Sequence, residues 1–162
     1  MASDNDARRE FLRHAVATLA YRGGKALRDV PEGFATVRAC ATCRSAGEIL
    51  KHIGDLLEWA LGLANGAHGW REAPSQSWES GVDRFFDELR QLDEYLAGDA
   101  PLAQPPEKLF QGAIADALTH VGQIATLRRL AGSPVRGENY YRAEIVMGRV
   151  GPEQSSKRVE FD

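Results

Sequence analysis

The sequence predicts an all-α fold: one four-helix bundle domain over residues 1–162, with an irregular or short extended C-terminal tail. Two observations predict it. Apolar side chains recur at the helical period in four long stretches, and segments rich in glycine, proline and serine separate these stretches. Amphipathic helices joined in this way assemble into bundles. The composition, 43% hydrophobic and 27% charged, is that of an ordinary globular chain.

The first helix is expected at residues 6–27. Its inward stripe is predicted to contain Phe11, Leu12, Ala15, Leu19 and Ala26. Gly23 and Gly24 lie near its end, and each glycine costs about 1 kcal/mol relative to alanine within a helix. The pair therefore either frays that end or lets a neighbouring helix approach closely.

The second helix is expected at residues 46–65 and has a clear start. Ser45 and Glu48 have the spacing of a capping box, in which each side chain accepts a hydrogen bond from a backbone amide at the helix end. The preceding connection, residues 28–44, is long and irregular. A connection of that length permits a crossover, so a simple up-down-up-down order of helices does not follow from the pattern.

The third and fourth helices are expected at residues 78–97 and 106–131. Pro106 suits the start of the fourth helix. Backbone N–H groups in the first turn of a helix have no intrahelical acceptor, so the missing N–H of proline breaks no hydrogen bond there. The tail, residues 132–162, does not show the helical period. Apolar and polar residues alternate at 141–147, which predicts one extended segment that packs across the bundle or onto a second subunit.

Composition and charge exclude several classes of function. The net charge of −3 gives no electrostatic footprint for nucleic acid or an anionic membrane. No apolar run reaches the roughly 20 residues of a membrane span, and the polar segment 1–6 does not resemble a signal peptide. Cys40 and Cys43 are too few for a disulfide scaffold, which predicts reduced thiols and a cytoplasmic location. Their Cys-x-x-Cys spacing occurs in redox motifs, but not within a predicted connection of this kind.

Three polar residues of ligand type are predicted to face the bundle interior. His52 lies among aliphatic residues on the apolar face of the second helix, and Asp116 and His120 are four residues apart on one face of the fourth. Two interpretations are open. One is a hydrogen-bonded core histidine beside an internal Asp–His ion pair. The other is one divalent metal ion, which bundles hold with residues on facing helices. The presence of all three residues adds support to the metal, and both interpretations stay open at this point.

Three segments resemble a known family. They are Ser-Ala-Gly-Glu-Ile-Leu-Lys-His-Ile-Gly-Asp-Leu at 45–56, His-Val-Gly-Gln-Ile at 120–124 and Gly-Ser-Pro-Val-x-Gly-Glu-Asn-Tyr at 132–140. These segments, in this helix order, are similar to the DinB-like (DinB/YfiT) superfamily of metalloenzymes. The resemblance implies a bundle of up-down-down-up order and often a homodimer. It also implies a divalent metal, most often zinc or nickel.

The resemblance assigns the ligands by position. His52 matches the family's histidine on the second helix, and His120 matches the last ligand on the fourth. The middle ligand is usually histidine and is Asp116 here. A carboxylate in place of a neutral imidazole lowers the net charge at the ion, so the centre is less electrophilic. Two histidines with one carboxylate also suit iron, so iron and manganese join zinc and nickel as candidates.

Two classes of function follow from these expectations. The first is a metal-dependent enzyme acting on a small molecule that the sequence does not identify. It would be either a transferase that uses a low-molecular-weight thiol or a hydrolase that uses metal-activated water. The second is a non-catalytic dimeric bundle that serves as a binding or structural protein, with an internal Asp–His pair in place of the metal. An open coordination position facing a solvent-connected cleft would favour the enzyme.

Overall fold

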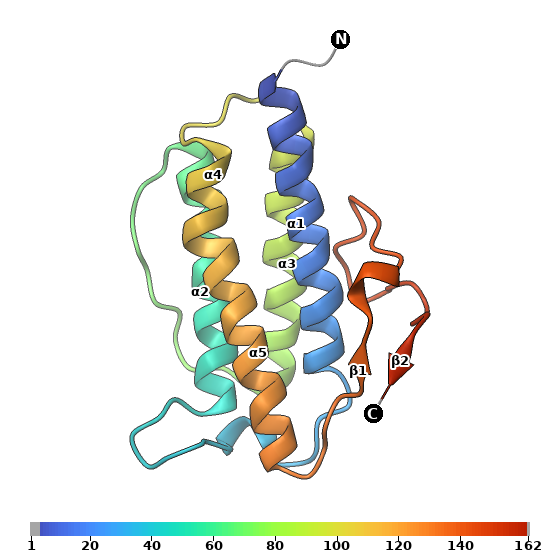
Figure 1. Ribbon diagram of the computed structural model, residues 1–162. Coiled ribbons are helices and arrows are strands. Elements are labelled where there is room, and N and C mark those ends of the chain that lie inside the picture. The colour runs from blue at the N-terminus through green and yellow to red at the C-terminus, as the bar shows by residue number, and fades with distance from the viewer. Residues whose placement is uncertain (1–3, 162) are drawn as a thin grey trace.

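The computed structural model of the chain describes residues 4–161 and contains four long helices packed as a bundle (Figure 1). The helices α1 (Asp4–Leu27), α2 (Ala46–Asn65) and α3 (Trp78–Ala97) are each continuous. The fourth begins as α4 (Pro106–Leu109), passes through the π-helical turn η2 (Phe110–Ile114) and continues as α5 (Ala115–Leu130). The all-α prediction and its four helices are confirmed. Residues 1–3 of the polar N-terminal segment lie outside the described residues.

The helices follow the up-down-down-up order. Figure 1 shows α1 and the fourth helix running one way and α2 and α3 the other. The backbone N–H of Ala103 donates to the carbonyl of Ala64 at 2.8 Å, so the end of α2 and the connection after α3 share one end of the bundle. The crossover is therefore the segment 66–77, which returns along the bundle, and not the longer connection 28–44.

The glycine pair of α1 lets α3 approach closely. A methyl group at Gly23 would lie 2.4 Å from Cζ of Phe85, and one at Gly24 would lie 3.3 Å from Cζ of Phe86. The glycine pair does not fray the end of α1, because the helix continues to Leu27. The second interpretation, close approach of a neighbouring helix, is the correct one. The predicted stripe of α1 is wrong at Phe11, whose residue surface is 68% exposed.

The capping box of α2 is confirmed. The backbone N–H of Glu48 donates to Oγ of Ser45, and the backbone N–H of Ser45 donates to Oε2 of Glu48. Gly66 ends the helix in the left-handed conformation, with φ of 85°, which glycine adopts without steric cost. These local signals place α2, and with it His52, at a fixed position along the bundle.

The tail forms a small two-stranded sheet beside α1. The strand β1 (Gly137–Glu138) pairs with β2 (Glu160–Phe161) in the antiparallel sense. The extended segment predicted at 141–147 is wrong, because a 3-10 helix occupies Tyr140–Arg142. Glu138 of β1 pairs with Glu160, which lies 22 residues later in the chain. The alternation of apolar and polar residues does not predict such a pairing.

Buried charges attach the tail to α1. The Lys25 ammonium donates to carboxylate oxygens of Glu138 at 2.9 Å and of Glu160 at 2.8 Å, and the Tyr21 hydroxyl donates to Glu138. The Arg22 guanidinium lies 4.2 Å from the centre of the Tyr140 ring. No helix within residues 4–161 is both long enough and apolar enough to cross a membrane.

Candidate metal centre

The structure brings His52, Asp116 and His120 together from α2 and α5. Nε2 of His52 lies 3.9 Å from Oδ2 of Asp116, and Nε2 of His120 lies 3.5 Å from Oδ1 of Asp116. The two imidazole rings meet edge to face with centroids 4.8 Å apart. One candidate ligand atom from each residue lies within 4.8 Å of the other two. The three residues singled out in the sequence therefore form one cluster.

The cluster lies at the edge of the bundle and is not buried in its core. The side chains of His120 and His52 are 12% and 19% exposed, while the carboxylate of Asp116 is 47% exposed. The expectation that Asp116 faces the interior is wrong. The core face of this helix is taken by Ala113, Ala117, Val121 and Ile124, and Asp116 lies beside that stripe. The cluster is consequently open to solvent on the Asp116 side.

A π-helical turn precedes the ligand-bearing part of the fourth helix. η2 ends at Ile114, two residues before Asp116. A π-helical turn contains more residues than an α-helical one, so it changes the direction in which later side chains point, and such turns are frequent at functional sites. The sequence pattern predicts one continuous α-helix here. Gly112, inside this turn, is the local signal that the helix is not regular.

Gln123 orients the His120 ring. Its Oε1 lies 2.7 Å from Nδ1 of His120, and since a carbonyl oxygen only accepts hydrogen bonds, Nδ1 holds the proton. The lone pair of the neutral ring is then on Nε2, the atom that faces Asp116 and His52. A hydrogen bond of this kind at the far nitrogen is a regular feature of metal-binding histidines. The sequence alone does not assign this role to Gln123, although its i, i+3 spacing from His120 allows it.

The crossover covers His52 with an aromatic side chain. The ring of Trp70 lies 5.6 Å from that of His52 and 5.9 Å from that of Trp59. Burial lowers the pKa of the His52 imidazole, and the positive charge of Arg44 lowers it further, against the opposing effect of Asp116. His52 is therefore neutral at neutral pH, which is the protonation state that a metal ligand needs.

A groove of about 290 Å³ opens beside His120, between α5 and the connection that precedes α2. The surface of its wall is largely apolar, with Ile49 and Leu127 among the lining residues. Gln123, Cys43 and Arg44 also line it. Of the three cluster residues, His120 lines the groove, while His52 and Asp116 do not.

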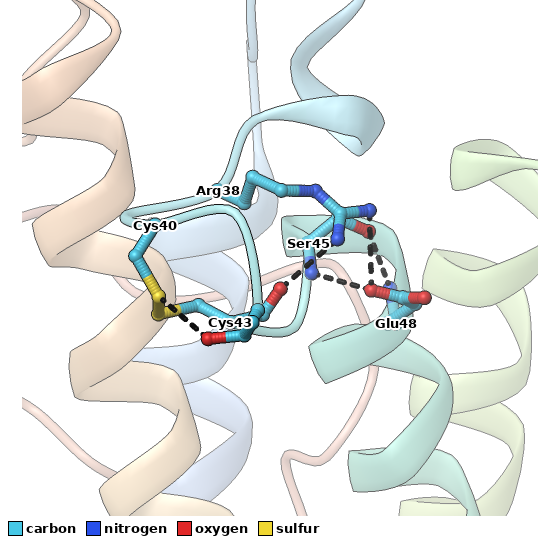
Figure 2. Close-up of a disulfide and its surroundings, with 6 residues drawn as sticks. Arg38, Cys40, Cys43, Ser45 and Glu48 are labelled. Carbon is cyan, nitrogen blue, oxygen red and sulfur yellow. Dashed lines mark hydrogen bonds and ion pairs between the residues drawn. A yellow bond between two sulfur atoms is a disulfide. The ribbon is translucent and has the colours of Figure 1, made fainter.

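Cys40 and Cys43 are joined by a disulfide at the edge of this groove (Figure 2). The expectation of reduced thiols is wrong for this structure. A turn in which the Cys43 N–H donates to the Cys40 carbonyl brings the two Cα atoms to 5.1 Å, within the usual range for a disulfide. The Arg38 guanidinium donates to the Cys43 carbonyl and pairs with Glu48, so the turn is attached to the first turn of α2.

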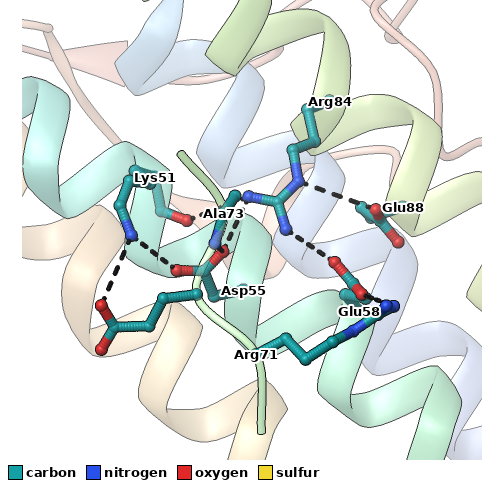
Figure 3. Close-up of polar contacts among 8 residues, drawn as sticks. Lys51, Asp55, Glu58, Arg71, Ala73, Arg84 and Glu88 are labelled. Atoms are coloured by element: carbon teal, nitrogen blue, oxygen red, sulfur yellow. Dashed lines mark hydrogen bonds and ion pairs between the residues drawn. The ribbon is translucent and has the colours of Figure 1, made fainter. Parts of the chain in front are cut away.

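A buried ion network is centred on Asp55, which lies on the same helix as His52 (Figure 3). Asp55 is 2% exposed and accepts hydrogen bonds from the guanidinium of Arg84, the ammonium of Lys51 and the backbone N–H of Ala73. The last of these attaches the crossover to α2. Burial opposes the ionisation of Asp55, but the three donors outweigh it, and the pKa of this carboxyl is lowered. Lys51 and Asp55 therefore serve this network, and neither is part of the metal cluster.

This network predicts a pH dependence of stability. Because the folded-state pKa of Asp55 is lowered, its contribution is present above the unfolded-state pKa of about 3.9 and is lost as the pH falls through the folded-state value. We expect the free energy of unfolding of the wild type to exceed that of Asp55→Asn by a constant amount above about pH 5, and by less toward about pH 3. Urea unfolding in the presence of EDTA measures both. A difference that grows on acidification would contradict the assignment.

Comparisons of the chain with protein-family models, with curated proteins and with solved structures find no match.

Proposed function

We propose that His52, Asp116 and His120 bind one divalent metal ion and that the chain is a metal-dependent enzyme of the DinB-like type. The observation that supports this is the meeting of three candidate ligand atoms within 4.8 Å, from two facing helices. Ligand bonds of about 2.0–2.1 Å around a tetrahedral ion place neighbouring ligand atoms about 3.3 Å apart. The contacts of Asp116 with the two rings, at 3.5 and 3.9 Å, are close to that value. The widest pair of candidate ligand atoms, up to 4.8 Å apart, must close by a larger side-chain rotation.

The donor set also fits a metal in its chemistry. Two neutral imidazoles present lone pairs, and the half-exposed carboxylate contributes one negative charge without a large desolvation cost. The alternative of an internal Asp–His pair fits less well. At 3.5 Å the Asp116–His120 contact is longer than a normal hydrogen bond, and the carboxylate faces solvent.

Three protein ligands leave coordination positions free for a small molecule. When bound, the ion acts as a Lewis acid and lowers the pKa of a coordinated water or thiol. The protein's own residues supply the rest. Gln123 fixes the His120 ring, Trp70 shields His52 from water, and the groove beside His120 admits the substrate. A thiol-dependent transferase and a metal-dependent hydrolase are the two reaction classes that we propose for this arrangement.

The DinB-like assignment is supported by the three segments that resemble the family. The segment 45–56 contains the capping box and His52, and 120–124 contains His120 and its partner Gln123. The third segment, 132–140, contains the strand β1, whose Glu138 joins the tail to α1. Zinc or nickel is the metal that the resemblance favours, while the carboxylate ligand admits iron or manganese. A homodimer belongs to the same proposal. A cytoplasmic location is proposed as well, although the Cys40–Cys43 disulfide removes the reduced thiols on which that prediction rested.

Metal analysis of His120→Ala tests the proposed centre. We expect the wild type, reconstituted with zinc, nickel, manganese or iron and then desalted, to retain about one ion per chain. We expect His120→Ala to retain almost none, because two ligands at a solvent-open edge hold a divalent ion weakly. Elemental analysis gives the stoichiometry, and circular dichroism checks that the variant is folded.

His14→Ala is the matched control, since His14 lies on the exposed surface of α1. It should retain the wild-type amount of metal. A wild type that stays empty with all four metals would refute the metal centre, and so would equal losses of metal in the two variants.

A further inference from the structure

We propose that the groove beside His120 binds a small organic anion and that Arg44 recognises its negative charge. The inference rests on the proposed function, because it takes this groove as the approach to the metal centre, and it adds the chemical class of the substrate. Its basis is the combination of an arginine without an ion-pair partner, an aliphatic wall and a ligand histidine along one groove.

The groove offers no acidic side chain to Arg44. Among the residues of the described chain that line it, none is aspartate or glutamate. Arg44 also makes no hydrogen bond or ion pair with any residue in the range 4–161, whereas Arg38 on the same connection pairs with Glu48 and with the Cys43 carbonyl. The guanidinium of Arg44 therefore has its hydrogen-bond donors free at the edge of the groove.

The backbone on both sides of Arg44 is fixed. Cys43, which precedes it, is held by the disulfide and by the hydrogen bond from Arg38. Ser45, which comes next in the chain, is the N-cap of α2 and is fixed by its reciprocal hydrogen bonds with Glu48. A guanidinium on such a rigid base loses less entropy when it pairs with an anion, so the binding position is partly pre-organised.

Charge and shape then define the ligand. An ion of charge +2 with one carboxylate and two neutral imidazoles retains a net charge of about +1, and Arg44 adds a second positive charge along the same groove. A guanidinium pairs well with planar oxyanions such as carboxylates. The volume of about 290 Å³ is at the lower limit of ligand pockets, and Ile49 and Leu127 provide an apolar wall. The expected substrate is a small carboxylate or similar oxyanion with an apolar body.

Hexanoate and its neutral analogue hexanamide are suitable probes. We expect zinc-loaded wild type to bind hexanoate more tightly than hexanamide, by titration calorimetry or ligand-observed NMR. In Arg44→Gln, hexanoate affinity should fall about tenfold, because a charge-assisted pair is lost, and the affinity for hexanamide should not change. Arg129→Gln, an exposed arginine of α5 outside the groove, removes the same charge and should bind hexanoate as the wild type does.

Measuring metal content and ligand binding separately distinguishes a failure of this inference from a failure of the proposed function. Elemental analysis of each variant reports the metal, and Arg44→Gln should keep it. Equal hexanoate binding by wild type and Arg44→Gln overturns the role of Arg44 even if metal is bound, and so does a lack of preference for hexanoate over hexanamide. A metal-free wild type that still prefers hexanoate through Arg44 would leave this inference standing while the metal centre fails.

Discussion

Replacing Arg84 by alanine should lower the free energy of unfolding by about 3 kcal/mol, the lower end of the loss seen when one partner of a buried ion pair is removed. Asp55 would keep Lys51 and the N–H of Ala73, but its buried carboxylate would lose the guanidinium 2.9 Å away. The Arg84 guanidinium also pairs with Glu58 at 3.0 Å, so a second acidic residue would lose one of its two partners and keep Arg71. Urea unfolding followed by circular dichroism measures the change.

Arg90→Ala is the matched control for Arg84→Ala. Arg90 lies on the same helix and pairs with Asp87 at 2.8 Å, but its side chain is 57% exposed against 16% for Arg84. Exposed pairs contribute about 0–1 kcal/mol, so this variant should be close to the wild type. Similar losses in both variants would show that burial does not set the strength of the Asp55 network.

Replacing Lys25 by methionine should destabilise the protein by about 3 kcal/mol and free the tail from α1. Glu138 has a fully buried side chain and would keep only the Tyr21 hydroxyl, while Glu160 would lose its partner on α1. Burial opposes the charge on Lys25, but hydrogen bonds to Glu160 and Glu138 outweigh it and raise its pKa, so the ammonium is charged at neutral pH. Limited proteolysis should cut the variant within 132–161 faster than the wild type.

Lys157→Met serves as the control, because Lys157 is an exposed lysine of the tail itself. It removes the same charge without breaking a buried pair. Its unfolding and its rate of proteolysis should match those of the wild type. If Lys25→Met also leaves the tail protected, the attachment of the tail depends on its apolar contacts and not on the ion network.

The helices could be predicted because the signals that place them are local. The capping box at Ser45, the left-handed glycine at Gly66 and the proline at the start of α4 each act on backbone groups within one turn. Each signal fixes a boundary whatever the rest of the fold does. The positions of His52 and His120 along their helices depend on these boundaries, and so does their meeting in the bundle.

The features that escaped prediction depend on contacts between distant residues. Asp55 is buried beside Arg84, and the periodicity of α2 does not predict that this arginine is its partner. The pairing of β1 with β2 is equally distant. Asp116 shares a helix face with His120, but it lies beside the buried stripe that contains Ala117, and helical spacing alone does not separate the middle of a face from its margin. The disulfide depends on the turn between Cys40 and Cys43, which sequence spacing allows but does not require.

The π-helical turn η2 also separates the fourth helix into two parts, α4 and α5, with different contacts. Each residue added to a helix rotates the remaining part of that helix by about 100°, so η2 gives α5 a rotational setting of its own relative to α4. The spacing of Asp116 and His120 is set entirely within α5, while α4 contacts the N-terminal part of α1 independently of it. Changes near Pro106–Leu109 can therefore adjust how α4 packs against the start of α1 without altering the spacing of the two ligands along α5.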